Sequence, residues 1–248
     1  MISAVIALAK REARRDLSDK GRMMFDIAWP LMILIVLGFG VDAFAPPKAG
    51  LPYWAFLGAG MIGLLIMRQA YSFGSMLEHE ARVGYREYLV TPVQRHWIII
   101  GSFLGRWTVQ SLLALAVLAA YSAAFQVFEV SKIAWAAIAV VISVGCGLSI
   151  GLAMSVWIKD LRDHALKSWL VAIALALVSG VFFPVSDLPF GIWRLSYISP
   201  LTYMIDWIRG AMIGVSALSP MSAMIITAGV GAVCLSIGIW KSERLFRL

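Results

Sequence analysis

The side chains in this sequence best suited to acid–base or metal chemistry are its three histidines, His79, His96 and His164. Only His164 stands close to two aspartates, Asp160 and Asp163 in the string KDLRDH, which could serve an enzyme that modifies lipids at a membrane surface. The simpler interpretation is a charged turn between two apolar segments. The sequence contains neither HExxH nor GxxxxGK[ST], so we expect no catalytic site, no metal site and no ATP hydrolysis by this chain through such a motif.

A second group of polar residues lies in EHEARVGYREYLVTPVQRH, which begins at Glu78 and joins two apolar runs. Glu78, Arg82 and Arg86 recur every four residues, a spacing at which the Glu–Arg attraction supports a helix. Tyr85 falls on an apolar stripe of the same helix, and the proline near the end of the string breaks it. A simple linking loop is the alternative, but it would not need the aromatic stripe. We therefore predict a docking helix within residues 78–92. Its docking residues would be Glu78, Glu80, Arg82, Gly84, Tyr85, Arg86, Glu87 and Tyr88.

The rest of the chain is strongly apolar. Of its 248 residues, 61% are hydrophobic and 14% are charged, and the mean hydropathy is +0.85. Soluble domains have about 25% charged residues, and each long apolar run here is close to the roughly 20 residues that cross a bilayer as a helix. We predict an all-α integral membrane protein with six transmembrane helices, forming a single domain over residues 1–248. The spans are predicted at 27–45, 53–73, within 97–127, within 133–158, at 166–184 and at 221–240.

Lysine and arginine are distributed unequally between the two sets of connections. Sixteen of the 21 lie in the N-terminal, second-to-third, fourth-to-fifth and C-terminal segments, four lie in the other connections, and Arg106 is left over. Because cationic connections remain on the cytoplasmic side, both termini are predicted to be cytoplasmic, which requires an even number of spans. The net charge of +7 is then explained by topology, without a nucleic-acid partner.

The N-terminal segment, residues 1–22, has the pattern of an amphipathic helix. Its apolar residues recur at helical spacing and its arginines lie on the opposite face, as is typical of a helix lying in the membrane surface. The alternative is a basic tail that only orients the first span. The predicted apolar face consists of Ile2, Val5, Ile6, Ala9 and Ala13, and the cationic face of Arg11, Arg14 and Arg15.

The connection between the fifth and sixth predicted spans, residues 185–219, is rich in aromatic residues and broken by prolines. Aromatic side chains favour the membrane–water interface, and Ser186 or Asp187 can cap a short helix that begins at Pro189. We predict two short helices within residues 185–210 that lie in, or dip into, the outer leaflet above a pathway. The candidate pathway or gate residues are Phe182, Phe183, Pro184, Asp187, Pro189, Tyr203 and Arg68.

Three charged residues stand within or beside predicted spans. Arg68 lies near the inner end of the second span, Arg106 in the long third run, and Asp26 near the start of the first. Long cationic side chains can extend from membrane depth to water, so we expect both arginines to reach the inner interface in this way. A role in a pathway or in a dimer contact is the alternative.

Three features together resemble the permease subunit of ABC-2 type (ATP-binding cassette) exporters. They are EHEARVGYREYLVTPVQR, the string GVFFPVSDLPFGIWRLSYISPLTYMIDWIRG from Gly180 to Gly210, and the basic amphipathic segment before six spans. The resemblance covers essentially the whole chain. It implies that residues 78–92 are a coupling helix for a separate ATPase subunit and that residues 185–210 are re-entrant helices closing the outer mouth. It also implies two permease copies, as a homodimer, with two ATPases that bind the ATP and Mg²⁺, while this chain binds no cofactor.

The function implied is outward transport of an amphiphilic or lipid-like cargo, such as a drug, glycolipid or polysaccharide, across the plasma (inner) membrane. The apolar, aromatic outer segment favours cargo of this kind. One alternative is an ATP-independent secondary transporter, which needs acidic groups at the middle of the membrane, where the sequence places none. The other is a membrane-embedded lipid-modifying enzyme built around His164.

Overall fold

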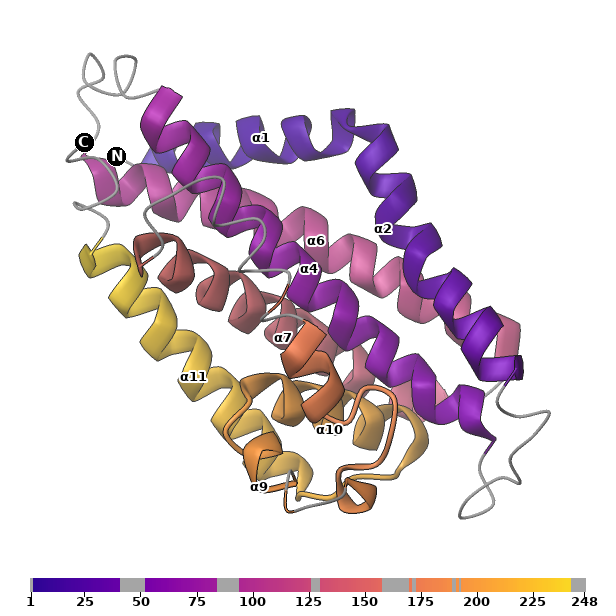
Figure 1. Cartoon of the computed structure of the whole chain (residues 1–248). Coiled ribbons are helices and arrows are strands. Elements are labelled where there is room, and N and C mark those ends of the chain that lie inside the picture. The colour runs from indigo at the N-terminus through magenta and orange to yellow at the C-terminus, as the bar shows by residue number, and fades with distance from the viewer. Residues whose placement is uncertain are drawn as a thin grey trace.

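The computed structural model describes residues 2–40, 52–83, 94–125, 130–157, 170, 173–188, 191 and 193–241. Every regular element within these residues is helical, which confirms the predicted all-α class (Figure 1). In chain order the elements are α1 (Ile2–Ser18), α2 (Lys20–Ile33), the π-helix η1 (Leu34–Phe39), α4 (Tyr53–Val83), α6 (Arg95–Phe125), α7 (Val130–Trp157), the 3₁₀ turn η3 (Val185–Asp187), α9 (Trp193–Ser196), α10 (Pro200–Ile213) and α11 (Pro220–Lys241).

Five helical segments of the described chain are long and apolar enough to cross a membrane. They agree with the first four and the sixth of the predicted spans. Of the fifth predicted span, 166–184, the structure describes residue 170 and residues 173–184, and within these residues the helix ends at 178, before a turn at 179–180. A total of six spans therefore stays a prediction. The five segments are Lys20–Gly38, Tyr53–Leu77, His96–Ala123, Lys132–Ser155 and Pro220–Lys241.

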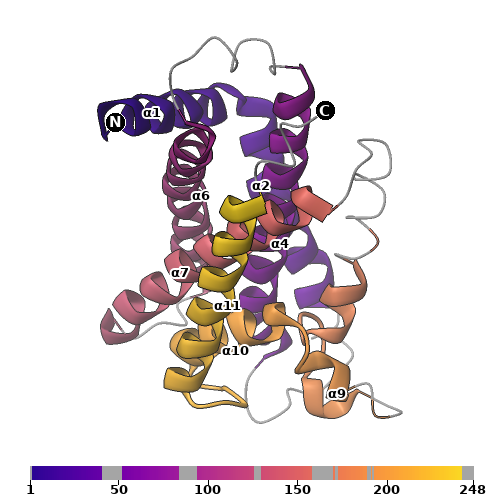
Figure 2. The same ribbon diagram turned by 90° about the vertical axis from the view of Figure 1, so that its left-hand side faces the viewer.

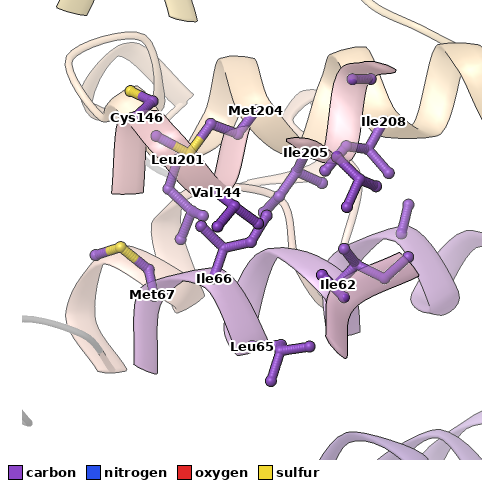
Figure 3. Packing of buried hydrophobic residues seen from close by; sticks show 14 of the residues in the cluster. Ile62, Leu65, Ile66, Met67, Val144, Cys146, Leu201, Met204, Ile205 and Ile208 are labelled. Carbon is purple, nitrogen blue, oxygen red and sulfur yellow. The ribbon is translucent and has the colours of Figure 1, made fainter. Parts of the chain in front are cut away.

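Helix α4 is the centre of the bundle, and α6, α7 and α10 all pack on it. In Figure 3, Ile62 and Ile66 of α4 face Leu201 and Ile205 of α10, with Val144 of α7 beside them. Ten of the 14 residues of α10 are buried. Since α10 also packs on α7 and α11, it is wedged among three spanning helices instead of lying on their surface.

Different helices mark the two ends of the bundle. Helix α1 lies across one end, where α4 finishes and α6 begins, and α9 and α10 lie at the other (Figures 1 and 2). We call these the α1 end and the α10 end. Between α1 and α2 the chain turns at Asp19, whose side chain accepts a hydrogen bond from the backbone N–H of Arg22 at 3.1 Å and so caps α2. This turn is the elbow through which α1 passes into the first span.

Glycines allow the central helices to approach closely. Gly147 and Gly151 of α7, at GxxxG spacing, face Ile66 and Ala70 of α4, and a Cβ placed on Gly151 would lie 1.9 Å from the carbonyl oxygen of Ala70. Small residues at such crossings let the backbones of membrane helices touch, which supplies packing that lipid cannot match. The crossing of α4 and α7 therefore depends on Gly151 having no side chain.

We predict that Gly151→Ala lowers the melting temperature of the detergent-solubilised protein. The added methyl group must push α7 away from α4, and overpacking of this kind costs about 1–3 kcal/mol; a chain of this size loses about 2–4 °C per kcal/mol. The matched control is Gly229→Ala in α11, where nothing lies within 4 Å of the new Cβ. Equal melting temperatures for the two variants would contradict this description of the crossing.

Candidate functional site

The predicted docking segment begins as an extension of α4. The backbone of residues 78–83 continues this helix without a break to Val83, so Glu78, Glu80 and Arg82 belong to the same rod as the second span. The prediction had placed them in a separate short helix. The remaining docking candidates, Gly84, Tyr85, Arg86, Glu87 and Tyr88, lie outside the described residues, and their role stays a prediction.

Helix α1 presents three faces to its surroundings. Val5, Glu12 and Asp16 form the buried face, which crosses α6. Ile6 and Leu17 form a stripe that is about half exposed, at 49% and 51%. The exposed cations form the third face: Lys10, Arg11, Arg14 and Arg15. The predicted apolar face is thus wrong in one respect, because it is divided between α6 and the surface and the buried part includes two carboxylates.

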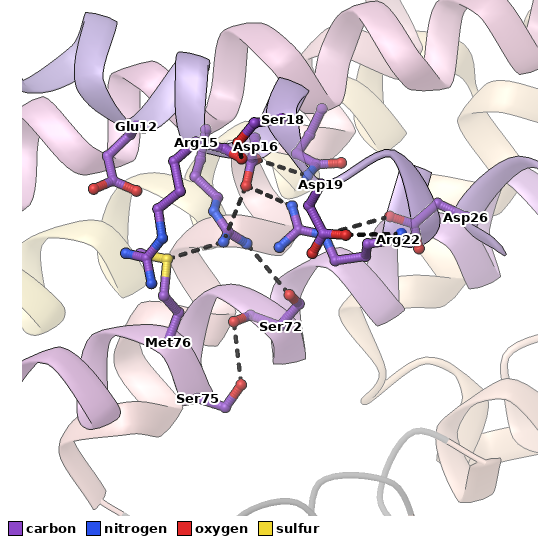
Figure 4. A network of polar contacts seen from close by, with 12 residues as sticks. Glu12, Arg15, Asp16, Ser18, Asp19, Arg22, Asp26, Ser72, Ser75 and Met76 are labelled. Carbon is purple, nitrogen blue, oxygen red and sulfur yellow. Dashed lines mark hydrogen bonds and ion pairs between the residues drawn. The ribbon is translucent and has the colours of Figure 1, made fainter. Parts of the chain in front are cut away.

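The Asp16 carboxylate of α1 meets a buried cation on α6. Arg106 is 2% exposed, and its Nη2 lies 3.1 Å from Oδ1 of Asp16. Its Nη1 donates to Ser72 Oγ at 3.3 Å, and its Nη2 approaches Met76 Sδ at 2.9 Å, both on α4 (Figure 4). Gln110 Nε2 donates to the other Asp16 oxygen at 3.0 Å. The expectation that Arg106 extends to water is wrong: a partner on α1 keeps it inside the protein.

The elbow residues continue this network toward α4. Arg22 Nη2 lies 2.5 Å from Asp16 Oδ1, and Arg22 Nε lies 4.0 Å from Asp26 Oδ2 (Figure 4). Asp26 also forms an ion pair with Arg68 of α4, whose guanidinium lies 4.7 Å from the ring centroid of Phe25. Arg68, predicted as a pathway or gate residue, is therefore placed at the α1 end and paired with the first span.

At the α10 end, two charged residues one turn apart hold the neighbouring loops. Asp206 accepts hydrogen bonds from the backbone N–H groups of Ala217 and Leu218, at 2.8 and 3.0 Å, just before α11 begins. Arg209 donates to the carbonyl oxygen of Gly180 at 2.8 Å and lies 3.6 Å above the ring centroid of Phe56 in α4. Burial lowers the pKa of Arg209 to about 10, against the opposing effect of the Asp206 charge, so Arg209 stays cationic at neutral pH.

The backbone of residues 180–182 is fixed at three points, one on α10 and two on α4. Besides the bond from Arg209 to Gly180, the carbonyl oxygen of Val181 touches Gly60, where a Cβ would lie 2.4 Å away. The carbonyl oxygen of Phe182 accepts a hydrogen bond from Tyr53 Oη at 2.9 Å. Gly180 itself has φ +75°, a conformation that favours glycine. The segment that follows the helical residues 173–178 is thus clamped to the start of the second span.

The predicted gate residues do not form one cluster. Phe182 is held at the clamp, Phe183 beside it is 56% exposed, and Asp187 is exposed in η3. Tyr203 Oη donates to the carbonyl oxygen of Tyr197, which ties α10 to the turn that follows α9. Pro184 lies half-buried beside η3, Pro189 lies outside the described residues, and Arg68 lies toward the other end of α4.

Sequence reasoning missed the residues that hold both ends together. Arg209 is counted there only as one of the four cations in the less cationic set of connections, and Asp16 and Asp206 are given no role. The sequence contained one signal for Asp206 and Arg209. They are an acid and an arginine three positions apart in an otherwise apolar helix, and such a helix seldom keeps a charged residue without a partner.

These features define a multi-span helical membrane protein with a transverse N-terminal helix and a buried helix before its last span. The family model "ABC-2 type transporter" matches residues 3–213. The chain therefore belongs to the ABC-2 type transporter family.

Curated relatives agree with this membership. The chain is 28% identical over 192 residues to an inner membrane transport permease, YadH, of Escherichia coli K12, covering 75% of this chain and 73% of the relative. It is 26% identical over 219 residues to Nodulation protein J of Rhizobium leguminosarum bv. trifolii, covering 86% and 80%. It is 27% identical over 228 residues to Nodulation protein J of Sinorhizobium fredii, covering 89% and 86%.

We predict that Arg209→Gln destabilises the protein, whereas the control Arg194→Gln does not. The first change removes a charge-assisted hydrogen bond to Gly180, worth about 1.5–3 kcal/mol, together with the contact with Phe56. Arg194 is exposed at the same end and lies 5.3 Å from the ring centroid of Trp193. Thermal unfolding in one detergent should show a drop for Arg209→Gln of at least about 3 °C. A drop no larger than that of the control would show that the clamp contributes little.

Proposed function

We propose that this chain is the membrane-spanning subunit of an ATP-driven exporter in the inner membrane. The observation that carries the proposal is the family match over residues 3–213. The name of the Escherichia coli relative, an inner membrane transport permease, supports the location. ATP and Mg²⁺ would be bound by a separate ATPase subunit, and two copies of this chain would work with two ATPases.

The proposed orientation places the α1 end in the cytoplasm. The exposed cations of α1, which are Lys10, Arg11, Arg14 and Arg15, lie at this end, as expected of a cytoplasmic segment. The faces of α1 fit a helix in the membrane surface, because its exposed apolar stripe, with Ile6 and Leu17, adjoins its exposed cations. The coupling helix within 78–92 would then meet the ATPase directly, as the continuation of α4.

The α10 end would form the outer closure of the pathway. Irregular backbone is tolerated at membrane depth only where protein or a cavity surrounds it. The buried face of α10 and the clamp at residues 180–182 meet this condition, which supports re-entrant helices within 185–210. The exposed aromatic side chains of Phe183 and Trp193 favour an amphiphilic or lipid-like cargo.

The buried carboxylates favour ATP-driven transport over a proton-driven carrier. Asp16 and Asp26 are bound by arginines, and Asp206 by two backbone N–H groups. A proton-driven carrier needs acidic groups that are available to the transport pathway. These three carboxylates are instead engaged in contacts that join parts of the fold.

We predict that gentle extraction from the source membrane yields a complex with two copies of this chain and two ATP-binding cassette subunits. Native mass measurement, with peptide identification of the co-migrating protein, provides the test. A complex that contains no nucleotide-binding subunit, even after crosslinking from position 85, would contradict the proposal.

We also predict that Tyr85→Ala, or the paired reversal of Arg86→Glu with Glu87→Arg, releases the ATPase without unfolding the permease. Both changes alter the proposed contact surface in water and leave the spans intact. The amount of ATPase retained on the purified permease measures the effect. Tyr197→Ala, an exposed tyrosine at the α10 end, is the matched control and should retain the ATPase. Unchanged ATPase retention in both variants would count against docking at this segment.

A further inference from the structure

Five charged residues at the α1 end form a continuous chain of alternating sign. This charge chain runs across four helices: α6, α1, α2 and α4. Glu12 is not a member, because its Oε1 pairs with Arg11 at 3.0 Å. In order the members are Arg106, Asp16, Arg22, Asp26 and Arg68.

The charge chain consists of two ion pairs joined by one shared arginine. Asp16 and Arg106 tie α1 to α6, and Asp26 and Arg68 tie α2 to α4. Arg22 lies between the two aspartates, 2.5 Å from Asp16 and 4.0 Å from Asp26. Both aspartates are nearly inaccessible, with exposures of 1% and 3%. In such a setting a carboxylate without a cation is strongly destabilising. If either pair separates, its aspartate stays neutralised only if Arg22 moves with that aspartate.

The charge chain also contacts α4, the helix that leads to the docking segment. Arg106 contacts Ser72 and Met76 of α4, and Met76 stands two residues before Glu78. Any displacement at the end of α4 therefore acts on Arg106 and, through Asp16, on α1. Through Asp26, the same helix acts on the start of the first span.

We propose that this five-residue charge chain is the linkage that passes movement of the α4 end to α1 and to the start of α2. The inference rests on the proposed exporter function for the source of that movement. Arg106, Arg22 and Arg68 are positioning residues in this linkage, and none of them needs to contact cargo or nucleotide. The sharing of Arg22 makes the linkage a property of the permease alone, which can be measured without the ATPase.

The sharing predicts a specific pattern of stability. In Arg106→Gln, Arg22 still neutralises Asp16, and in Arg68→Gln it still neutralises Asp26, so each single change should be mild. In the double variant Arg22 has two orphaned aspartates to neutralise and can serve only one fully. The melting temperature should then fall by at least about 3 °C more than the sum of the single effects.

The control is the same set of variants in an Arg22→Gln background. Without the shared arginine each end arginine has its own aspartate, and the two changes should add to within about 1 °C. Arg14→Gln, an exposed cation of α1, should add to any of these variants. Additive effects with Arg22 present would overturn the linkage, and so would an equally large excess with Arg22 replaced.

If the double variant does not fold, adding Asp16→Asn to it decides the question. This third change removes the aspartate that Arg22 cannot serve and leaves Arg22 paired with Asp26. Recovery of a folded, monodisperse protein supports the linkage. A triple variant as poor as the double contradicts it.

Transmission itself is measured on the complex with its ATPase, with Cys146 and Cys234 replaced by alanine. Met24 of α2 is 71% exposed beside the elbow, so maleimide labelling of Met24→Cys follows the start of the first span. We expect ATP with vanadate to change the labelling rate, and Asp26→Asn to abolish this change because it removes the pairing of α2 with Arg68 of α4, while Arg14→Gln preserves it. A nucleotide effect that persists in Asp26→Asn overturns the linkage and leaves the exporter function standing. If no ATPase binds the unsubstituted chain, the exporter proposal fails, and the melting-temperature cycle still decides whether the linkage exists.

Discussion

The structure depends on one constraint: a charged group buried in this protein must find its counter-charge or its hydrogen-bond partners within the protein. Arg106 is 2% exposed and Asp16 is 1% exposed, and each is tolerable because it meets an opposite charge: Asp16 for Arg106, and both Arg106 and Arg22 for Asp16. The arrangement of α1 follows, since Asp16 reaches Arg106 only when α1 lies across α6. The same constraint acts at the α10 end, where Arg209 brings the backbone of Gly180 against α4.

Helix α4 connects the two charged regions. It is a single α-helix of 31 residues, Tyr53–Val83. Phe56 meets Arg209 near its start, and Arg68 and Ser72 meet the elbow network further on. With a rise of about 1.5 Å per residue, Phe56 and Ser72 are about 24 Å apart along this rod. Because an unbroken helix resists bending, a tilt of α4 at the docking segment would be felt at both ends of the bundle.

Local patterns predicted most of the helices, and long-range pairing escaped them. Each span is visible in its own hydropathy, so the first four predicted spans and the last one match apolar helices. In the fifth, 166–184, the structure describes helix only at residue 170 and at residues 173–178. The partner of Arg106 lies 90 positions earlier, at Asp16, and nothing in the neighbourhood of either residue identifies the other. Sequence reasoning therefore predicted that Arg106 extends to water, which is the environment of lowest free energy for an arginine considered alone. The docking and gate assignments stay predictions, because most of the docking segment lies outside the described residues and the gate residues are scattered.

Charge pairs and glycine contacts also explain which spans are held loosely. Apolar side chains gain little by leaving lipid for protein, so membrane helices choose neighbours through close packing and polar contacts. Helix α4 has both, and its span is 72% buried, whereas the spans of α2 and α11 are each 22% buried. The first span is held by Asp26 near its start and, at its other end, by η1, which packs on α4 through buried Leu34 and through Gly38 beside Trp54. Helix α11 is held chiefly by the Asp206 bonds before it and by Gly231 and Gly238 against α7. The first span is therefore attached to α4 at both ends while most of its surface stays exposed, and α4 serves as the frame.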